Sequence, residues 1–195
     1  MIRQRTATSV AAAALLAVLL AGCTAASNIG PAGSTSSADD TITEIAAADR
    51  GDPIVFAGKL EDGAAANSTD WLGSVVVVNF WYAACPPCRA EAPDLEALYE
   101  QFAPDGVVFI GVNVRDSAAT ATAFANKFGI TYPSIIDANG SSVQLAFAGQ
   151  IAPNAVPTTI VLDREGRATA RIVGRIPSRI TLATLIEDAL AEGAK

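Results

Sequence analysis

Two cysteines separated by two prolines, Pro86 and Pro87, are the residues of this chain best suited to chemistry. Cys85 and Cys88 follow a valine-rich run and open a segment with the pattern of a helix. Because the dipole and the free amide groups at a helix N-terminus stabilise a thiolate, Cys85 is expected to be the nucleophile. Cys88 lies one turn further along and is expected to be the more buried thiol, which resolves a mixed disulfide by attacking it. The pair therefore predicts thiol–disulfide exchange.

Two other uses of a cysteine pair have to be weighed against redox chemistry. A zinc site needs further ligands, but the chain has no histidine and only one more cysteine, Cys23. A purely structural disulfide also occurs in exported proteins, although closing so short a loop contributes only about 2 kcal/mol in the chain-entropy model. Because the sequence holds no nucleotide, flavin or metal motif, no cofactor and no metal are expected.

The composition excludes several other kinds of function. The 195 residues carry a formal net charge of −7, and the 13 lysines and arginines are scattered singly, which argues against nucleic-acid binding. Without histidine, neither a Ser-His nor a Cys-His pair is available to activate a nucleophile. Chemistry therefore has to rely on thiols or carboxylates. The length, with 51% hydrophobic residues, fits one folded domain of typical size.

The first 22 residues have the pattern of a secretion signal. Arg3 and Arg5 precede an unbroken apolar run over residues 10–20, and small residues then lead to Cys23. The run is shorter than the roughly 20 apolar residues that a membrane-spanning helix needs. The Leu-Ala-Gly-Cys ending resembles the lipobox of bacterial lipoproteins, which predicts lipidation of Cys23 and attachment to the extracytoplasmic face of the cell membrane. A signal peptide cut elsewhere and an uncleaved anchor are the alternatives.

The segment between the signal and the cysteine pair changes in composition near residue 50. Residues 23–50 are expected to form a flexible, lipid-anchored tether, because they are rich in small and polar residues and contain no aromatic side chain. Part of residues 41–48 could form a helical turn. The folded domain is expected over residues 51–195.

Hydrophobic periodicity predicts the elements that position the cysteines. Strands are expected over residues 53–60, 74–81, 107–114, 134–137, 158–163 and 168–173. Helices are expected over 86–102, with a kink at Pro93, and over 117–128, 141–147 and 178–192. This order of elements predicts an α/β fold in which a central mixed sheet is flanked by helices on both faces.

The segment over residues 75–98 resembles the TlpA/ResA group of membrane-tethered, thioredoxin-like oxidoreductases. The resemblance rests on Asn-Phe-Trp, followed by Cys-Pro-Pro-Cys-Arg-Ala-Glu and a proline at position 93, and it extends as a hydrophobic pattern over about residues 50–193. It implies a thioredoxin-like fold, with an extra βα insertion over residues 106–132. It also implies thiol–disulfide exchange outside the cytoplasm.

The same resemblance implies roles for residues near the cysteine pair. Val156 and Pro157 match the family's cis-proline loop, where a fixed backbone facing Cys85 can pair with an extended substrate segment. Glu91 lies three residues after Cys88, on the same helix face, and matches a functional glutamate. The alternative for Glu91 is an exposed charge that interacts favourably with the helix dipole.

Three further positions limit how far the family's residue roles apply to this chain. Asn79 stands where thioredoxins have a buried aspartate that accepts a proton, so that role is absent here or falls to Glu91 or water. Trp81 is expected to serve packing rather than chemistry. Ala84 replaces the tryptophan that the family usually has before the first cysteine, which thins the aromatic rim of the site.

The sequence thus predicts exchange with thiols or disulfides of exported proteins, and electrons from a membrane or extracytoplasmic redox protein. Reduction is the expected direction, with cytochrome c maturation as one setting that the resemblance implies. The helix dipole and Arg89 favour the thiolate, whereas the prolines between the cysteines lack amide donors and Glu91 adds a like charge. The balance predicts only modest stabilisation of the thiolate. Oxidation of secreted proteins is the alternative, and a non-catalytic binding lipoprotein with a structural Cys-x-x-Cys disulfide is an alternative of another class.

Overall fold

The computed structural model describes residues 34–36, 41–151 and 155–192. In these residues the chain forms a seven-stranded sheet with the order β1-β2-β9-β8-β5-β6-β7 and a two-stranded hairpin of β3 and β4. The strands are β1 (Ser34–Ser36), β2 (Ile42–Ile45), β3 (Ala57–Lys59), β4 (Ala65–Asn67), β5 (Val76–Trp81), β6 (Val108–Asn113), β7 (Ser134–Ile136), β8 (Thr158–Leu162) and β9 (Ala168–Val173). The helices are α2 (Pro86–Phe102), α3 (Ala118–Phe128), α4 (Ser142–Ala146) and α5 (Arg179–Glu192), with 3-10 turns η1 (Ala47–Asp49), η2 (Ser68–Trp71) and η3 (Ala103–Asp105).

Strand β5 is the element that leads into the cysteine pair. All six of its residues are buried, and it pairs in parallel with β6 and antiparallel with β8. Strand β6 pairs in parallel with β7, while the pairs between β1, β2, β9 and β8 are antiparallel. The predicted mixed sheet is therefore confirmed. Strand β6 and α3 occupy the residues at which the resemblance placed an additional βα unit.

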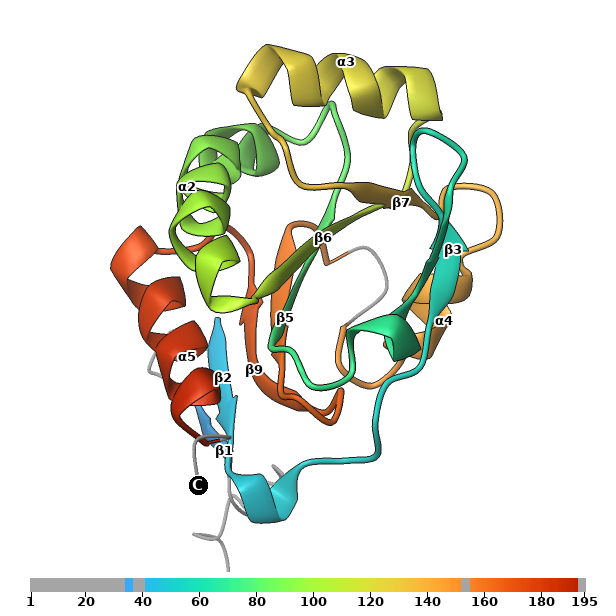
Figure 1. Ribbon diagram of the computed structural model, residues 1–195. Coiled ribbons are helices and arrows are strands. Elements are labelled where there is room, and N and C mark those ends of the chain that lie inside the picture. Colours follow the sequence, from blue (N-terminus) through green and yellow to red (C-terminus); the bar gives the residue numbers. More distant parts are fainter. Residues whose placement is uncertain (1–33, 37–40, 152–154, 193–195) are drawn as a thin grey trace, which may run out of the picture. The chain divides into compact units, whose positions relative to one another are not determined.

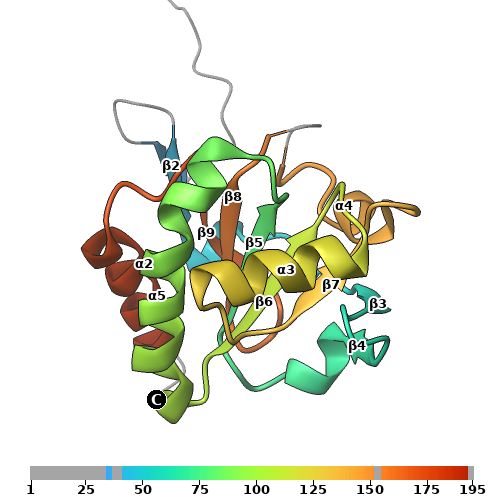
Figure 2. The same ribbon diagram turned by 90° about the horizontal axis from the view of Figure 1, so that it is seen from above.

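The two faces of the sheet carry separate parts of the core. Alternation along β5 sends Val77 to the cluster built with α2 and α5, whereas Val76 and Val78 belong to the cluster that contains Phe147. Figure 1 shows α2 and α5 side by side on one face, with α4 and β3 at the other. Helix α3 runs beside α2 (Figure 2), and the two helices enclose a third cluster that contains both cysteines.

The strand predicted over residues 53–60 is wrong for its first half. Strand β3 begins only at Ala57, because the preceding main chain is bonded elsewhere. The Ile54 amide donates to the carbonyl of Gly166 at 2.9 Å, and the Phe56 amide donates to the hydroxyl of Ser68 at 2.9 Å. These contacts fix residues 54–56 against the β8–β9 turn and η2, where no neighbouring strand continues the pairing.

The predicted tether also needs correction at its C-terminal end. Residues 42–45 form β2, which pairs with β9 in the central sheet, and Ile42 packs against the core. Their composition gives little sign of this, because the strand is stabilised by pairing with a segment more than a hundred residues away. The folded domain therefore begins before residue 51. For the residues outside those described, the tether stays a prediction.

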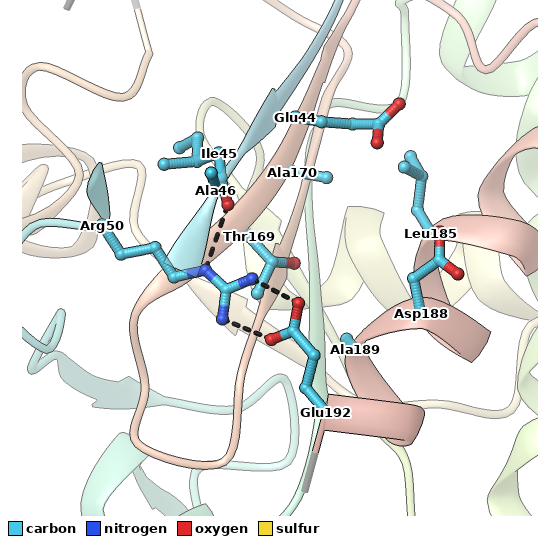
Figure 3. A pocket seen from close by; sticks show the side chains of 10 residues that line it. All are labelled: Glu44, Ile45, Ala46, Arg50, Thr169, Ala170, Leu185, Asp188, Ala189 and Glu192. Carbon is cyan, nitrogen blue, oxygen red and sulfur yellow. Dashed lines mark hydrogen bonds and ion pairs between the residues drawn. The ribbon is translucent and has the colours of Figure 1, made fainter. Parts of the chain in front are cut away.

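Arg50 joins this N-terminal segment to the rest of the domain. Its guanidinium donates to the carbonyl of Ile45 at 3.1 Å and to both carboxylate oxygens of Glu192, at 2.5 and 2.7 Å (Figure 3). It also donates to Asp163 in the β8–β9 turn at 3.2 Å. The Arg50 side chain is only 4% exposed, so the contact is part of the folded structure rather than a surface ion pair.

Candidate active site

The cysteine pair lies at the junction of β5 and α2, as predicted. Cys85 and Cys88 form a disulfide, and Cys85 is the N-cap residue of α2. Its Sγ accepts a hydrogen bond from the Cys88 amide at 3.2 Å. Because Pro86 and Pro87 have no N–H, the Cys88 amide is the first in the helix that can reach this sulfur. The helix N-terminus therefore supplies one backbone donor to Cys85.

Both cysteines are buried, and the expectation that Cys88 is the more buried one is wrong. Cys85 is 1% exposed and Cys88 is 3% exposed. The reason is that both cysteines pack into one cluster with Trp81 and Phe124, against which Val156 also packs. Burial therefore does not distinguish the two sulfurs, and the order of attack rests on their positions along the helix.

Glu91 lies in the interior, which excludes the exposed-charge interpretation. Its carboxyl group has no solvent exposure and is held by two donors from different elements. Asn79 of β5 donates to Oε1 at 3.0 Å, and the amide of Ile176, which follows β9, donates to Oε2 at 3.0 Å. Asn79 also donates to the hydroxyl of Thr159 at 3.1 Å. The position that is an aspartate in thioredoxins therefore contacts the glutamate of this chain.

Burial raises the pKa of Glu91 from its ordinary value of 4.5 to about 7. The hydrogen bonds from Ile176 and Asn79 and the positive charge of Arg175 act in the opposite direction, while the charge of Asp94 adds to the rise. Desolvation is the largest cause, because a carboxylate loses its hydration in the protein interior. A group with this pKa can accept or donate a proton near neutral pH.

The proline loop has the conformation that the resemblance implied. The Val156–Pro157 peptide bond is cis, and Val156 packs against the cluster that contains both cysteines. The Pro157 carbonyl accepts the amide of Gly174 at 2.8 Å, and the Thr158 hydroxyl donates to the carbonyl of Ala155 at 2.7 Å. The first bond ties the loop to the end of β9, and the second closes the loop internally. Its role in substrate binding is a proposal.

Trp81 packs as expected. Its ring centre lies 4.4 Å from that of Phe124 on α3, and its indole N–H donates to the hydroxyl of Ser134 at 3.3 Å. This bond passes over Gly111 of β6, where any side chain would collide with Ser134 Oγ and the indole nitrogen. The glycine therefore permits the close approach that orients Trp81 within the cysteine cluster.

Asp116 holds the loop before the cysteines, and reasoning from the sequence missed it. Its Oδ2 accepts the Ala83 amide at 2.6 Å and the side-chain amide of Asn113 at 2.9 Å. Asn113 is also the residue that pairs with Trp81 in the parallel β5–β6 register. The signal in the sequence was that Asn113 and Asp116 come at and just after the end of β6, which is parallel to β5. Because the carboxyl ends of parallel strands meet at one edge of the sheet, polar residues there can contact the loop after β5.

A buried Cys-x-x-Cys disulfide at the start of a helix, set beside a cis-proline loop on a mixed sheet, defines a thioredoxin-like protein. The Redoxin family model matches residues 38–186, so the chain belongs to the Redoxin family.

Individual relatives agree with this assignment. The chain is 35% identical over 106 residues to the thiol-disulfide oxidoreductase ResA of Geobacillus thermodenitrificans, which covers 54% of this chain and 58% of the relative. It is 34% identical over 128 residues to the thiol:disulfide interchange protein DsbE of Pseudomonas aeruginosa, covering 63% and 66% of the two chains. The chain therefore spans less than two thirds of the length of these curated relatives.

Solved structures cover more of the chain. A DsbF homologue from Corynebacterium diphtheriae has a TM-score of 0.69 and 30% identity, covering 82% of this chain and 99% of its own. A secreted thiol-disulfide isomerase from Corynebacterium glutamicum has a TM-score of 0.72 and 29% identity over the same shares. The fold is therefore shared over the whole of these relatives.

The predicted lipidation site lies outside the described residues. Cys23 precedes the first of them, and its lipidation stays a prediction. Among the helices that the structure describes, none combines the length and the apolar character needed to cross a membrane.

Proposed function

We propose that this protein is a membrane-tethered, extracytoplasmic thiol–disulfide oxidoreductase that reduces disulfides in exported proteins. The observation that carries the proposal is the Cys85–Cys88 disulfide at the start of α2, in one buried site with the cis-proline loop. The names of the ResA and DsbE relatives support the same chemistry. The lipobox-like sequence before Cys23 supports the tether.

The exchange proceeds through a mixed disulfide. In the reduced protein, the Cys85 thiolate attacks one sulfur of the partner's disulfide, so that an intermolecular S–S bond forms and the partner's other sulfur leaves as a thiolate. Cys88 then attacks the Cys85 sulfur, which closes the intramolecular disulfide and releases the partner's second thiolate. Two electrons pass from the protein to its partner.

Glu91 is the proton acceptor that we propose for the second step. Cys88 has to lose its thiol proton before it can attack, and Glu91 lies one helical turn further along α2. A pKa of about 7 suits a general base near neutral pH. Asn79 and the Ile176 amide orient the carboxylate, so that the side chain is fixed before the reaction begins.

We infer the reducing direction from the small number of hydrogen-bond donors that reach Cys85, although the positive charge of the neighbouring Arg89 favours the thiolate. The Cys88 amide is the one donor to its sulfur that the described residues supply, and both intervening residues are prolines. A strong oxidant such as DsbA depends on a much more stabilised thiolate. A weakly stabilised thiolate corresponds to a reducing couple, which needs a membrane or extracytoplasmic redox protein to restore its dithiol. Cytochrome c maturation is the setting that we propose from the resemblance to the TlpA/ResA group.

The reduction potential tests the direction. We expect a value near the roughly −270 mV of thioredoxin when the protein is equilibrated with glutathione and dithiothreitol buffers and its thiols are counted by alkylation. A value above about −180 mV, typical of protein disulfide isomerase, would support the oxidase alternative instead.

Turnover tests whether the pair is catalytic at all. The protein should reduce a disulfide-bonded protein substrate when dithiothreitol supplies electrons, and Cys85→Ser should abolish this activity. Cys23→Ala is the matched control, because it removes a cysteine but leaves the pair. A disulfide that resists mild dithiothreitol, with no turnover, would identify a structural staple.

A further inference from the structure

Four exposed cations lie on or beside residues that contact the cysteine site, in a chain whose formal net charge is −7. They come from four separate segments: α2, the β6–α3 loop, α3 and the β9–α5 loop. The four are Arg89, Arg115, Lys127 and Arg175, all of them exposed, and we call them the basic collar.

Two members of the basic collar share one aromatic ring. Arg89 directly follows Cys88, and its guanidinium carbon lies 5.7 Å from the ring centre of Phe128. The Lys127 ammonium lies 5.8 Å from the same ring centre. Phe128 packs against the cluster that contains both cysteines. The α2 and α3 side of the site therefore presents two cations that an aromatic face holds in place.

Arg115 holds the corresponding position on the loop before the cysteines. Its guanidinium carbon lies 4.1 Å from the ring centre of Tyr82. The Tyr82 carbonyl accepts the Cys85 amide at 3.1 Å, so this cation stacks on a residue bonded to the nucleophile's own backbone. Tyr82 packs against the cysteine cluster as well.

Arg175 completes the basic collar on the side of the proline loop. Its neighbour Gly174 donates to the Pro157 carbonyl at 2.8 Å, and its other neighbour Ile176 donates to Glu91 at 3.0 Å. The backbone on both sides of Arg175 is therefore fixed to the site.

Within the part of the chain that the structure describes, no carboxylate forms an ion pair with a member of the basic collar. The ion pairs there involve Arg50, Arg167 and Arg179. Of the carboxylates near the site, Glu91 is buried and Asp116 bonds to the Ala83 amide and Asn113. Asp94 pairs with Arg179 at 3.4 Å. The cations are left available to a group from outside.

We propose that the basic collar is a docking surface for an acidic polypeptide segment next to the cysteine of the partner protein. This inference deepens the proposed function and rests on it. Opposite charges across an interface raise the association rate and fix the orientation of the partner. The net negative charge of the chain disfavours an acidic partner elsewhere, so docking at the collar brings the partner's disulfide to Cys85. Stacked side chains also lose less conformational freedom on binding than free ones.

Peptide disulfides that differ only in flanking charge test the proposal. Three peptides share one cysteine pair and are flanked by glutamate, glutamine or lysine, and kcat/KM is measured for each with the full protein. At low salt we expect the glutamate peptide to react about tenfold faster than the glutamine peptide, and the lysine peptide to be slowest. The difference should shrink toward unity at about 1 M salt, where the Debye length falls to roughly 3 Å.

Charge-removing variants locate the effect. Arg115→Met and Lys127→Met should each lower the ratio of the glutamate rate to the glutamine rate by about threefold at low salt. Using this ratio cancels any effect of the lost charge on the thiol itself. Lys59→Met is the matched control, since Lys59 is an exposed cation on β3 whose removal should leave the ratio as it is.

Four outcomes would overturn the proposal that the basic collar docks an acidic segment. Equal rates for the glutamate and glutamine peptides, or a ratio that survives in the Arg115→Met, Lys127→Met double variant, would reject it while exchange itself still supports the proposed function. Loss of sedimentation with phosphatidylglycerol vesicles in the double variant, without a peptide preference in the parent, would identify a lipid-binding surface instead. Absence of exchange with all three peptides would reject both the function and the docking surface.

Discussion

The carboxylate of Glu91 is 0% exposed, and its two bonded partners are N–H donors from β5 and from the segment after β9. Both donors favour the charged form, yet the pKa is raised to about 7 because desolvation outweighs them. The residue therefore changes charge in the pH range in which the exchange is expected to operate. This property is the one that the proposed role of Glu91 as a proton acceptor for Cys88 requires.

Replacing Glu91 by glutamine should change the titration of the reduced site. Glu91→Gln removes a like charge one helical turn from Cys88, so the pKa of the nearby thiolate should fall, as followed by ultraviolet thiolate absorbance. The resolving step should slow about tenfold or more at pH 7, because its proton acceptor is gone. Glu100→Gln is the control, because it changes an exposed glutamate on the same helix. Titration curves that superimpose on those of the parent would return Glu91 to a structural role.

The same substitution should alter how stability depends on pH. A carboxyl whose folded-state pKa lies above its unfolded value stabilises the fold below pH 4.5, and this contribution is lost as pH rises through about 7. The shift corresponds to about 3 kcal/mol. Urea unfolding of the oxidised parent should therefore show a decline between about pH 4.5 and about pH 7 that Glu91→Gln lacks. Parallel declines in the two proteins would contradict this assignment.

At the residue scale, the sequence predicted the cysteine pair because spacing and the helix start are local features. The cis bond at Pro157 came from resemblance alone, since no local pattern distinguishes it. The burial of Glu91 could not be decided, because it depends on Ile176, which is 85 residues away along the chain. Asp116 was missed for a similar reason, as its partner Ala83 lies 33 residues before it.

At the scale of elements, Arg50 connects three parts of the fold that are distant in sequence. Its guanidinium bonds the end of β2, the β8–β9 turn and the last turn of α5. The pKa of Arg50 is raised above its ordinary value, chiefly by the hydrogen bond to Glu192. The pair holds the N-terminal strand against the helix that covers β9, so removing it should loosen that edge of the sheet.

Arg50→Met should lower the free energy of unfolding by about 2–3 kcal/mol, which urea denaturation measures. This loss should be smaller than that caused by removing one partner of a fully buried ion pair. Asp163 keeps its bond to Arg167 at 2.9 Å, and the Glu192 side chain is 45% exposed to solvent. Arg179→Met is the matched control. Its ion pair with Asp94 is 3.4 Å long and involves an arginine side chain that is 61% exposed, so its loss should cost less than about 1 kcal/mol. Equal losses in the two variants would show that Arg50 acts only as a surface charge.

Elements with strong periodicity were predicted well, and those held by distant partners were not. The valine run of β5 and the helix α2 carry their own signals of burial and of a helix start. Strand β2 has only Ile42 and Ile45 as large apolar residues, and its place in the sheet depends on β9. Residues 53–56 looked like part of a strand because they form a short apolar run before a turn. Their main-chain hydrogen bonds instead go to a turn and a side-chain hydroxyl.

At the scale of the whole molecule, charge and attachment have to be considered together. Cleavage before Cys23 would remove two arginines and leave eleven basic residues against twenty acidic ones, a net charge of −9. Such a chain is repelled by anionic lipid headgroups. The four cations of the basic collar lie beside the cysteine site. Stable attachment would therefore rest on acyl chains rather than on the protein surface.

Cys23→Ala tests this proposed anchor in the intact cell. Without the cysteine, no thiol is available for the lipid, so the protein should either appear in the medium or accumulate as an unprocessed precursor, and it should lose incorporation of labelled palmitate. Thr24→Ala, which changes the neighbouring residue and keeps the cysteine, should stay membrane-bound and labelled. The reduction potential should be the same in both variants, because Cys85 and Cys88 are intact. A Cys23→Ala protein that is processed normally and remains on the membrane through high-salt and carbonate washes would show that another part of the chain provides the attachment.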